Sequence, residues 1–502
     1  PWRGKLWLVE LMDGDVGTGM NAAAFGDIQI SGITCDSREV HAGYLFAAIP
    51  GAQDDGRRFI PDALKRGAAA ILAPPGTTIE PPETPVPIIT DDNPRRQYAL
   101  MAARFFADQP ANIACVTGTN GKTSVVSFLR QILAAAGHRA ASAGTLGVEL
   151  SGYADCAAPT LRHAINLTTP DPADLHRSLA ELASHRIDHL GLEASSHGLA
   201  QYRLDGVRVA AAAFINLTRD HLDYHGDETA YLAAKSRLFA EIVVDGGVVV
   251  INADIPEADG LRSIATGRGL RVIDYGRDAT DLVLVDVVAD GTGQTLAVDI
   301  FGHRHDVRLP LLGAFQTTNA LAALGLAVAT GVSEQTAVGA LAELEGVRGR
   351  IELVARHPNG AAIYVDYAHT PDALKSVLET LRPHLAGELH VVFGCGGDRD
   401  PGKRVEMGRY AAAVAEHVIL TDDNPRTEDP AEIRKAARVG CPDALEIGDR
   451  AEAITAGVKA LQPGDILVVA GKGHEPGQIV GNTIIPFDDA DVVRQVVQGM
   501  NA

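Results

Sequence analysis

The chain has 502 residues, and at about 150 residues per domain this length predicts about three domains rather than one large core. Lys and Arg number 44 and Asp and Glu number 64, so the net charge of −20 disfavours nucleic-acid binding and loose self-association, and we expect a monomer. No apolar run approaches the ~18 residues of a membrane span. The five cysteines include no C-x-x-C pair, which argues against a disulfide framework or a structural zinc site. This cysteine pattern favours a reducing cytoplasm.

Strand-like apolar runs alternate with Ala-rich helical stretches, which is typical of α/β domains with mainly parallel sheets. Residues 1–109 form a small α/β module, set apart by its Pro-rich stretch 74–87. Residues 110–345 form a central domain with a parallel sheet and helices on both faces. Residues 346–502 form a Rossmann-like α/β domain that begins before the predicted strand 361–365.

One pentapeptide, Asp-Asp-Asn-Pro-Arg, occurs twice, at 91–95 and at 422–426. Each copy follows an Ile- or Val-rich strand and precedes a helical pattern. An Asn N-cap followed by Pro at the first helical position therefore explains either copy without a ligand.

A glycine-rich loop at 116–124 lies between the strand around Cys115 and a helix from Thr123. Its glycines allow backbone N–H groups to face a polyphosphate, Lys122 can reach the β and γ oxygens, and Thr123 can coordinate Mg²⁺. The spacing is tighter than in the general G-x-x-x-x-G-K-[ST] loop, so this is a variant form. ATP binding is the main interpretation, and a glycine-rich turn with an exposed lysine is the alternative.

Two further residues are candidates on their own chemistry. Glu193 ends the apolar strand 187–192 and is either a Mg²⁺ ligand or a carboxylate at a helix N-terminus. Asn319 opens an Ala/Leu-rich helix predicted over 319–330, a position that is typical of a helix cap. Lys235 on its own is typical of a solvated helix lysine.

The loop resembles that of the Mur ligases and the related folylpolyglutamate synthases, and blocks from about residue 28 to 490 continue the resemblance in order. The matching blocks lie at 36–38, 51–56, 118–123, 193–203, 216–225, 234–239, 366–374, 396–400 and 471–475. Within the family they are most similar to the branch that adds the third residue of the peptidoglycan stem peptide. The resemblance implies an ATP-dependent ligase that joins meso-diaminopimelate to the D-Glu carboxylate of UDP-N-acetylmuramoyl-L-Ala-D-Glu through an acyl phosphate.

It further implies a UDP-binding first domain, a central ATP-binding domain and an amino-acid-binding third domain. The ATP contacts would be Gly118, Thr119, Asn120, Gly121, Lys122, Thr123, Ser124, Asn319, Arg350 and Asp366. The catalytic residues would be Lys122, Glu193, His221 and Lys235, and the Mg²⁺ ligands would be Thr123, Glu193, His221 and Lys235. In the family the matching lysine is carbamylated, which turns an ammonium into a carboxylate-like group.

The UDP-muramoyl-dipeptide would contact Ser37, Ala52, Gln53, Asp54, Thr168, Thr169, Ser195, Gln201 and Arg203. The meso-diaminopimelate site would comprise Arg399, Asp423, Asn424, Pro425, Arg426, Gly471 and Glu475. Arg399 and Arg426 would bind carboxylates and Glu475 the distal ammonium, so a lysine substrate would be disfavoured. The copy at 91–95 lies in another domain, and we interpret it as a coincidental strand-to-helix turn.

Three alternatives remain open from the sequence. Two are sibling ligases of the same fold, a lysine-adding enzyme and a folylpolyglutamate synthase. The third is a non-catalytic ATP-binding module, in which the loop holds nucleotide and Glu193, His221 and Lys235 are incidental. ATP would stabilise both an enzyme and a binding module, so amide formation is the observation that separates them.

Overall fold

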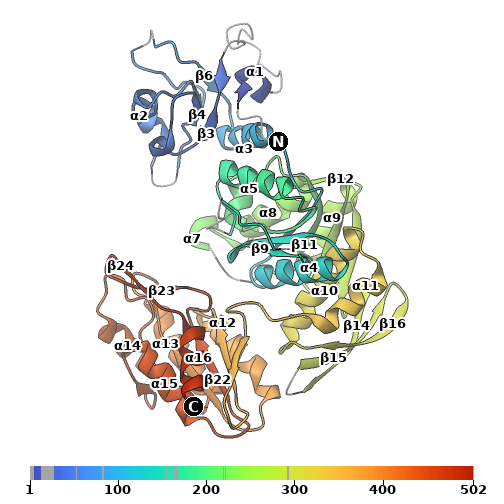
Figure 1. The fold of residues 1–502 in the computed structure, drawn as a ribbon, viewed down its shortest axis with the longest axis vertical. Coiled ribbons are helices and arrows are strands. Elements are labelled where there is room, and N and C mark those ends of the chain that lie inside the picture. The colour runs from blue at the N-terminus through green and yellow to red at the C-terminus, as the bar shows by residue number, and fades with distance from the viewer. Residues whose placement is uncertain are drawn as a thin grey trace. The chain divides into compact units, whose positions relative to one another are not determined.

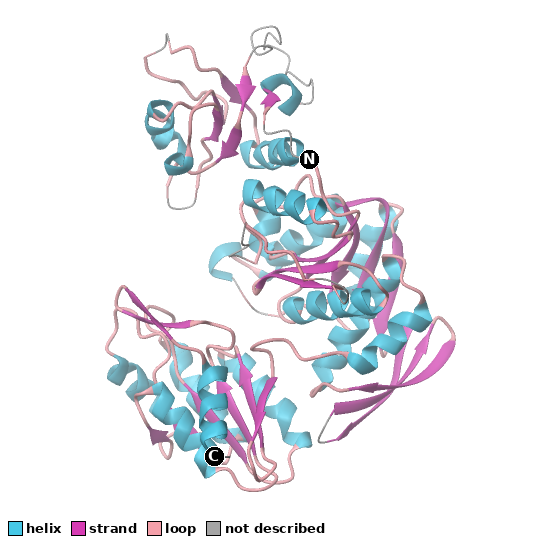
Figure 2. Ribbon diagram, viewed as in Figure 1, coloured by secondary structure: helices cyan, strands magenta, loops and turns pink. Residues whose placement is uncertain are grey.

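The structure is a computed structural model that describes residues 5–12, 28–51, 54–81, 84–153, 157–162, 168–218, 220, 222–290 and 293–500. The chain separates into two compact units. The first comprises Pro1–Val283, Ile300–Gly302 and Asn319–Ala340, and the second comprises Leu284–Asp299, His303–Thr318 and Leu341–Ala502. The α/β class is confirmed (Figures 1 and 2), whereas domain limits near residues 109 and 345 stay a prediction.

The N-terminal part of the first unit is built on a four-stranded parallel sheet of order β3-β4-β5-β6. Its elements are β1 (Leu6–Trp7), α1 (Leu8–Leu11), β2 (Gln29–Ile30), β3 (Gly32–Thr34), β4 (Tyr44–Ala47), α2 (Ile60–Lys65), β5 (Ala70–Ala73), β6 (Ile88–Thr90) and α3 (Pro94–Phe106). Asn93 caps α3, accepting a hydrogen bond from Arg96 N at 3.2 Å, with Pro94 at the first position. The interpretation of this copy of the pentapeptide as a strand-to-helix turn is therefore confirmed.

A ten-stranded sheet follows, of order β16-β15-β14-β13-β12-β11-β7-β10-β8-β9. Its strands are β7 (Asn112–Thr117), β8 (Ala140–Gly144), β9 (Gly147–Ser151), β10 (His189–Glu193), β11 (Val209–Phe214), β12 (Val243–Asn252), β13 (Arg271–Gly276), β14 (Leu282–Asp290), β15 (Gly293–Ile300) and β16 (His303–Leu309). From β8 through β10, β7, β11 and β12 to β13 the pairing is parallel. The carboxyl ends of these strands therefore share one edge of the sheet, which is where open α/β sheets bind ligands.

Helices cover both faces of this sheet (Figure 2). The helices along this stretch of the chain are α4 (Lys122–Ala135), α5 (Pro172–Ser184), α6 (Ser196–Ala200), α7 (Leu222–His225), α8 (Glu228–Arg237), α9 (Ala258–Gly267), α10 (Ala314–Ala329) and α11 (Glu334–Ala340). Leu179 of α5 and Leu261 of α9 join the buried cluster on one face together with Cys115 of β7. Burial of such apolar side chains, at about 25 cal/mol per Å², fixes the strand ends in place.

The second unit contains a six-stranded sheet of order β17-β18-β22-β19-β20-β21, parallel except for the edge strand β17. Its elements are β17 (Glu352–Arg356), β18 (Ala362–Asp366), α12 (Pro371–Leu381), β19 (Leu389–Phe393), α13 (Gly402–Val414), β20 (His417–Leu420), α14 (Pro430–Arg438), β21 (Leu445–Glu446), α15 (Arg450–Ala460), β22 (Ile466–Ala470) and α16 (Asp489–Met500). Two buried clusters, one with α12, α13 and α14 and the other with α15 and α16, give helices on both faces.

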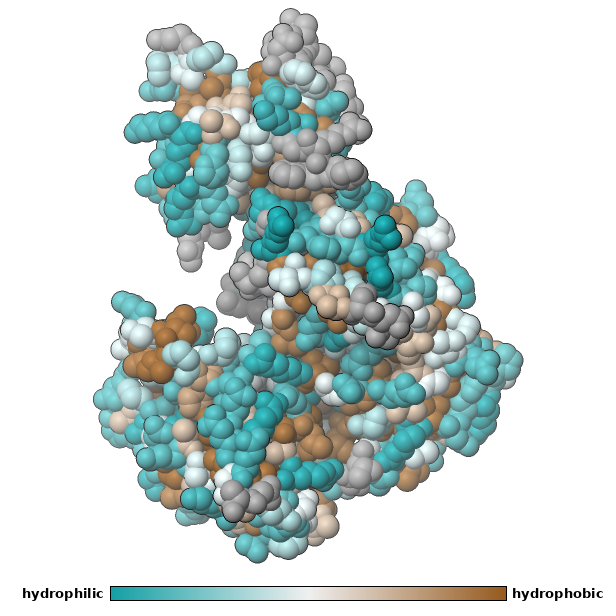
Figure 3. Space-filling view, viewed as in Figure 1, coloured by the Kyte–Doolittle hydropathy of each residue, from teal (hydrophilic) through white to brown (hydrophobic). Residues whose placement is uncertain are grey.

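A hairpin of β23 (Gly477–Val480) and β24 (Thr483–Pro486) projects from the second unit. Ile484 is 69% exposed and Ile485 47% exposed, and hydrophobic side chains form a brown patch at this hairpin in Figure 3. Among the described residues, no helix has the length and apolarity that crossing a membrane requires.

Two local predictions are wrong. The helix predicted over 319–330 begins at Ala314, so Asn319 lies inside α10 and is not its cap. The second pentapeptide copy does not start a helix, because α14 begins at Pro430 and Asp429 is its N-cap. In both cases a helix does form nearby, but tertiary contacts decide at which residue it begins.

Candidate active site

The phosphate loop lies at the carboxyl end of β7 and leads directly into α4. Gly118 and Gly121 have φ of 157° and 88°, and at Gly121 a Cβ would lie 2.5 Å from Oδ1 of Asn319. Lys122 donates to the carbonyls of Gly118 and Thr119, both at 2.9 Å. The loop is therefore folded with its lysine over the turn, and Asn319 packs against it from α10.

Asn216, which follows β11, holds the loop from the neighbouring strand. Its Oδ1 accepts hydrogen bonds from the backbone N–H groups of Thr119 and Asn120, both at 2.9 Å. Its Nδ2 donates to the carbonyl of Asn120 at 2.9 Å. Asn216 lies in a block that resembles the family, but its role could not be predicted from the sequence, because only the pairing of β11 with β7 brings it to the loop.

Lys235 lies on α8 and reaches the same loop. Its side chain is buried, with 1% of the residue exposed, and Nζ donates to the carbonyl of Gly118 at 2.7 Å. Burial, reinforced by the charge of Lys122, holds the pKa of Lys235 well below that of an ordinary lysine. The interpretation as a solvated helix lysine is therefore wrong. A neutral buried amine is the form that can add CO₂, so the environment suits a carbamate.

Glu193 lies at the carboxyl end of β10, adjacent to β7. Its carboxylate accepts hydrogen bonds from the backbone N–H of Thr145 at 3.0 Å and from the Thr145 hydroxyl at 3.1 Å. A cavity of ≈ 10 Å³ lies between Glu193, Thr123 and Ser127, which is about the space that one water-sized particle needs. Thr145 was missed by the sequence analysis, since nothing local marks it.

The predicted muramoyl-peptide residues gather next to Glu193. Thr169 Oγ1 donates to the carbonyl of Glu193 at 3.1 Å and accepts from the backbone N–H of Ser195 at 3.0 Å. Arg203 donates to the carbonyl of Thr169 at 2.7 Å and to Oε1 of Gln201 at 2.7 Å. Thr168 hydrogen-bonds Thr145 at 2.9 Å, so the hydroxyl-rich group is continuous with the carboxylate of Glu193.

The predicted uridine-diphosphate residues belong to the N-terminal part. Ser37 is buried at the start of a 3-10 turn, and Asp54 is exposed with its carboxylate 3.3 Å from Arg58. Ala52 and Gln53, like the predicted Mg²⁺ ligand His221, lie outside the described residues. The structure thus describes only part of this predicted binding surface.

The second unit carries the other predicted nucleotide contacts. Asp366 ends β18, is buried, and accepts hydrogen bonds from the backbone N–H groups of Ile351 and Ala368, each at 2.7 Å. Burial raises the pKa of Asp366, although the charge of Arg350 opposes the shift. Arg350 lies 4.8 Å from the ring centre of Tyr367. Both side chains are held in defined positions within their own unit.

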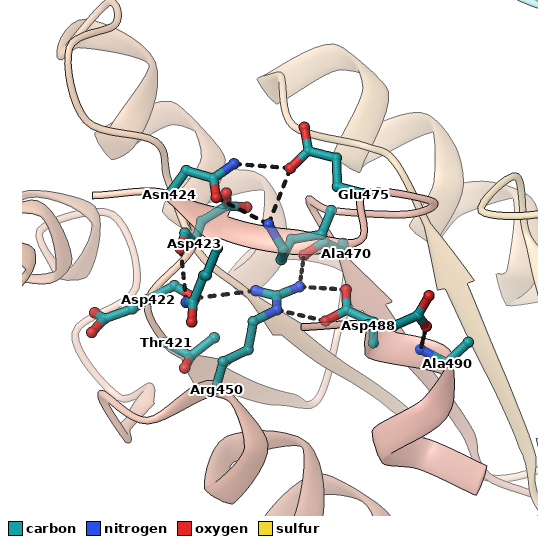
Figure 4. Close-up of polar contacts among 12 residues, drawn as sticks. Thr421, Asp422, Asp423, Asn424, Arg450, Ala470, Glu475, Asp488 and Ala490 are labelled. Atoms are coloured by element: carbon teal, nitrogen blue, oxygen red, sulfur yellow. Dashed lines mark hydrogen bonds and ion pairs between the residues drawn. The ribbon is translucent and has the colours of Figure 1, made fainter. Parts of the chain in front are cut away.

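The second pentapeptide copy forms a polar cluster with the segment after β22. Asn424 donates to Oε2 of Glu475 at 2.9 Å, and the buried Lys472 donates to Oδ1 of Asn424 and to Oε2 of Glu475, both at 3.0 Å. Figure 4 shows the amide of Asn424 directed at Glu475. Burial opposes ionisation of Glu475, but the hydrogen bond from Asn424 and the charge of Lys472 outweigh it and lower its pKa. Glu475 therefore stays anionic, as an ammonium partner requires.

Arg426 is held in an unusual backbone conformation beside this cluster. Its φ is 52°, its N–H donates to the carbonyl of Ile479 at 3.0 Å, and its own carbonyl accepts from Gly481 at 2.7 Å. The hairpin β23–β24 therefore fixes the backbone, while the guanidinium donates to the carbonyl of Gly397 at 2.8 Å. Arg399, two residues along from Gly397, is exposed. The structure brings both arginines to one region of the second unit.

A buried ion pair between Arg450 and Asp489 lies next to this polar cluster. Arg450 and Asp489 are each 0% exposed at the side chain and share two hydrogen bonds of 2.7 Å. Arg450 also donates to the carbonyls of Ala470 at 3.0 Å and Asp422 at 3.3 Å, as Figure 4 shows. These two carbonyls immediately precede the segments that carry Gly471 and Asp423, so the ion pair sets where both segments leave the sheet.

Replacing Asp489 with Asn should therefore lower the free energy of unfolding by about 3 kcal/mol, because it leaves a buried guanidinium without its counter-charge. Asp491→Asn on the same helix is the matched control, since Asp491 is 65% exposed and pairs with Arg494 at 3.1 Å. The control should change stability by less than about 1 kcal/mol. Urea unfolding of both variants measures the difference, and equal stabilities would contradict this account.

The central site contains groups that fit ATP and Mg²⁺. Backbone N–H groups at the start of α4 and the ammonium of Lys122 suit phosphate oxygens. The Thr123 hydroxyl and the Glu193 carboxylate border the cavity and are hard oxygen ligands of the kind that Mg²⁺ prefers. A phosphate loop and a carboxylate at adjacent strand ends can bring two anions together with a cation between them.

Three protein-family descriptions match successive parts of the chain. They are the Mur ligase family catalytic domain at residues 29–107, the Mur ligase middle domain at 116–327 and the Mur ligase glutamate ligase domain at 349–473. Two similar curated proteins are both UDP-N-acetylmuramoyl-L-alanyl-D-glutamate–2,6-diaminopimelate ligases. The one from Caulobacter vibrioides is 49% identical over 95% of this chain and 97% of its own length. The one from Brucella melitensis is 50% identical over 92% and 93%.

Solved structures show the same fold. A structure of a UDP-N-acetylmuramoyl-L-alanyl-D-glutamate–2,6-diaminopimelate ligase aligns with a TM-score of 0.73 at 33% identity, over 99% of this chain and 100% of that one. A Mycobacterium tuberculosis folylpolyglutamate synthase complexed with ADP and AMPPCP aligns with a TM-score of 0.60 at 18% identity, over 75% and 92%. At that identity the second likeness concerns the fold alone.

Proposed function

Because the chain belongs to the Mur ligase family, we propose that it joins meso-diaminopimelate to the D-Glu side-chain carboxylate of UDP-N-acetylmuramoyl-L-Ala-D-Glu, with cleavage of ATP. The observation that carries this proposal is the similarity, near 50% identity over almost the whole length, to curated ligases of that reaction. The reaction supplies a tripeptide precursor for peptidoglycan and hence for cell-wall growth.

The first step transfers the γ-phosphoryl group of ATP to the substrate carboxylate, which gives an acyl phosphate and ADP. Lys122 and the N–H groups of the loop offset the charge of the phosphate oxygens, since the two reacting groups are both anions. Thr123, Glu193, His221 and a carbamate on Lys235 would hold Mg²⁺, which would supply further positive charge to the phosphate oxygens. Thr168, Thr169, Ser195, Gln201 and Arg203 orient the muramoyl peptide beside Glu193.

In the second step the amine of meso-diaminopimelate attacks the acyl carbon, the C–O bond to phosphate breaks, and the amine loses a proton. We assign the carboxylates of the amino acid to Arg399 and Arg426 and its distal ammonium to Glu475. The anionic state of Glu475 and the fixed backbone of Arg426 support this assignment. Two guanidinium groups facing the ammonium of a lysine would disfavour lysine.

ATP use is supported by the family and by nucleotide-bound structures of the same fold. We further propose that Asn319 contacts the adenine of ATP and that Arg350 and Asp366 contact its phosphate and ribose. Ser37, Ala52, Gln53 and Asp54 would contact the UDP end of the other substrate. The protein acts on small molecules, and we propose that it does so as a monomer in the cytoplasm. Free thiols at Cys35, Cys115, Cys395 and Cys441 fit such a reducing compartment.

Phosphate release tests the proposed reaction. With Mg-ATP and UDP-N-acetylmuramoyl-L-Ala-D-Glu, we expect release only when meso-diaminopimelate is added, together with one tripeptide product per phosphate. Phosphate release with L-lysine at the same rate would support ligase activity but would show that the enzyme does not select meso-diaminopimelate. ATP binding without release in any combination would overturn the proposal in favour of a non-catalytic module.

A further inference from the structure

A group of side chains with metal-ligating atoms lies at the opposite end of the central sheet. His138 precedes β8, Asp188 precedes β10 and His189 begins it, and one ligand atom from each lies within 4.8 Å of the others. Since β8 and β10 are parallel neighbours, their amino ends meet at one edge. Glu193 lies four residues from His189 along β10, or ~13 Å away, so this group is separate from the ATP site.

The distances from the two histidine nitrogens to the carboxylate of Asp188 suit a transition-metal site. His138 Nδ1 lies 3.4 Å from Oδ2 of Asp188, and His189 Nδ1 lies 3.3 Å from Oδ1 of the same carboxylate. Ligands held about 2.0–2.1 Å from Zn²⁺ at tetrahedral angles are about 3.3 Å apart.

One observation points to a missing ligand. The side chain of His189 is 4% exposed, and its Nδ1, although 3.3 Å from Oδ1 of Asp188, makes no hydrogen bond with any residue that the structure describes. Oδ1 of Asp188 is likewise buried without a described hydrogen-bond partner. Leaving buried polar atoms unsatisfied is costly, and a cation between them would satisfy both.

The other ring nitrogen of His189, Nε2, contacts Asn112. Its Nε2 lies 3.2 Å from the side-chain amide of Asn112, the first residue of β7. The amide nitrogen of Asn112 faces Nε2, and since the amide oxygen and nitrogen of Asn are interchangeable by a flip, the flipped amide accepts a hydrogen bond from Nε2–H. That leaves a lone pair on Nδ1, the arrangement by which metal-bound histidines are oriented.

We propose that His138, Asp188 and His189 form a binding site for a Zn²⁺-class divalent transition metal. His138 and Asp188 are 34% and 47% exposed at the side chain, so the ion enters from solvent and keeps water in the fourth position. The ion ties together the segments that lead into β8 and β10. The sequence argued against zinc only through its cysteines, and this site uses none.

A similar group in the second unit, Glu388, His390 and His417, provides an internal comparison. There, His417 Nε2 already contacts Glu388 at 2.7 Å and His390 Nε2 contacts Asp465 at 3.2 Å. These two contacts are hydrogen bonds, and among the described residues no buried side-chain atom of this second group lacks a partner, unlike His189 Nδ1 and Asp188 Oδ1 in the first group.

The test is equilibrium dialysis of the whole protein against Zn²⁺, in excess Mg²⁺ so that hard-ligand positions are filled. Bound zinc is counted for the wild type, His138→Ala, Asp188→Asn and His417→Ala. We expect one zinc ion that each of the first two variants binds at least about tenfold more weakly and that His417→Ala retains. Co²⁺ in place of Zn²⁺ should give the visible absorption of a tetrahedral site in the wild type and in His417→Ala only.

Thermal unfolding without added metal checks that the variants fold, and both altered side chains are partly exposed. Zinc should then raise the unfolding temperature of the wild type but not that of His138→Ala. A wild type that binds no zinc, or a His138→Ala variant that binds it with wild-type affinity, would overturn the proposal. Neither result bears on the ligase reaction.

Discussion

Replacing Lys235 with alanine is expected to lower the rate of phosphate release by about 10²–10³-fold, the usual cost of removing one preorganised charged group at a phosphoryl-transfer site. Lys235 is buried, its Nζ donates to the carbonyl of Gly118, and burial lowers its pKa. As a carbamate it would add negative charge for a cation while its remaining N–H kept the bond to Gly118. The measurement is single-turnover phosphate release in wild type and variant.

A purely structural role for Lys235 predicts a different outcome. If the lysine only holds the loop, acetate or propionate cannot replace it, whereas a lost carbamate can be replaced by a small carboxylate. We therefore expect partial rescue of Lys235→Ala by propionate, and a carbamate ¹³C signal in wild-type protein supplied with labelled bicarbonate. Lys435→Ala is the control, because Lys435 is 74% exposed on α14. Full activity of Lys235→Ala would refute the carbamate.

The elements of the site that could be predicted are those with a local signal. The loop at 118–124 and Glu193 follow apolar strands, and parallel strands bring their carboxyl ends together, so their proximity follows from the pattern alone. Thr145 and Lys472 carry no such signal. Each acts through a partner far away in the sequence, Glu193 in one case and Asn424 in the other, and only the folded chain makes them neighbours.

The duplicated pentapeptide shows why a local pattern is not sufficient. Asn93 caps a helix, whereas Asn424, in an identical pentapeptide, hydrogen-bonds Glu475 and accepts from Lys472. The difference comes from the surroundings, since the hairpin β23–β24 holds the backbone of Arg426 at positive φ and prevents a helix from starting there. Tertiary contacts overrode the same capping preference in one copy and not in the other.

The two copies of the pentapeptide also provide a matched control for the proposed amino-acid site. Arg426→Ala should lower kcat/KM for meso-diaminopimelate by about 10²-fold, since a charge-assisted, two-pronged hydrogen bond to a carboxylate is worth about 1.5–3 kcal/mol. Arg95→Ala removes the same residue from the other copy, where Arg95 donates to the carbonyl of Pro50 in the N-terminal part. It should leave the KM for the amino acid unchanged.

Arg426→Lys separates charge from geometry. A lysine keeps the positive charge but lacks the planar fork, so we expect it to recover less than half of the lost kcat/KM. L-lysine as substrate completes the comparison, and wild type should use it poorly. Arg426→Ala should reduce the preference for meso-diaminopimelate over L-lysine, because it lowers the turnover of meso-diaminopimelate. If wild type and Arg426→Ala showed the same preference between the two amino acids, Arg426 would not be the selector, and the choice would have to lie with Arg399 and Glu475.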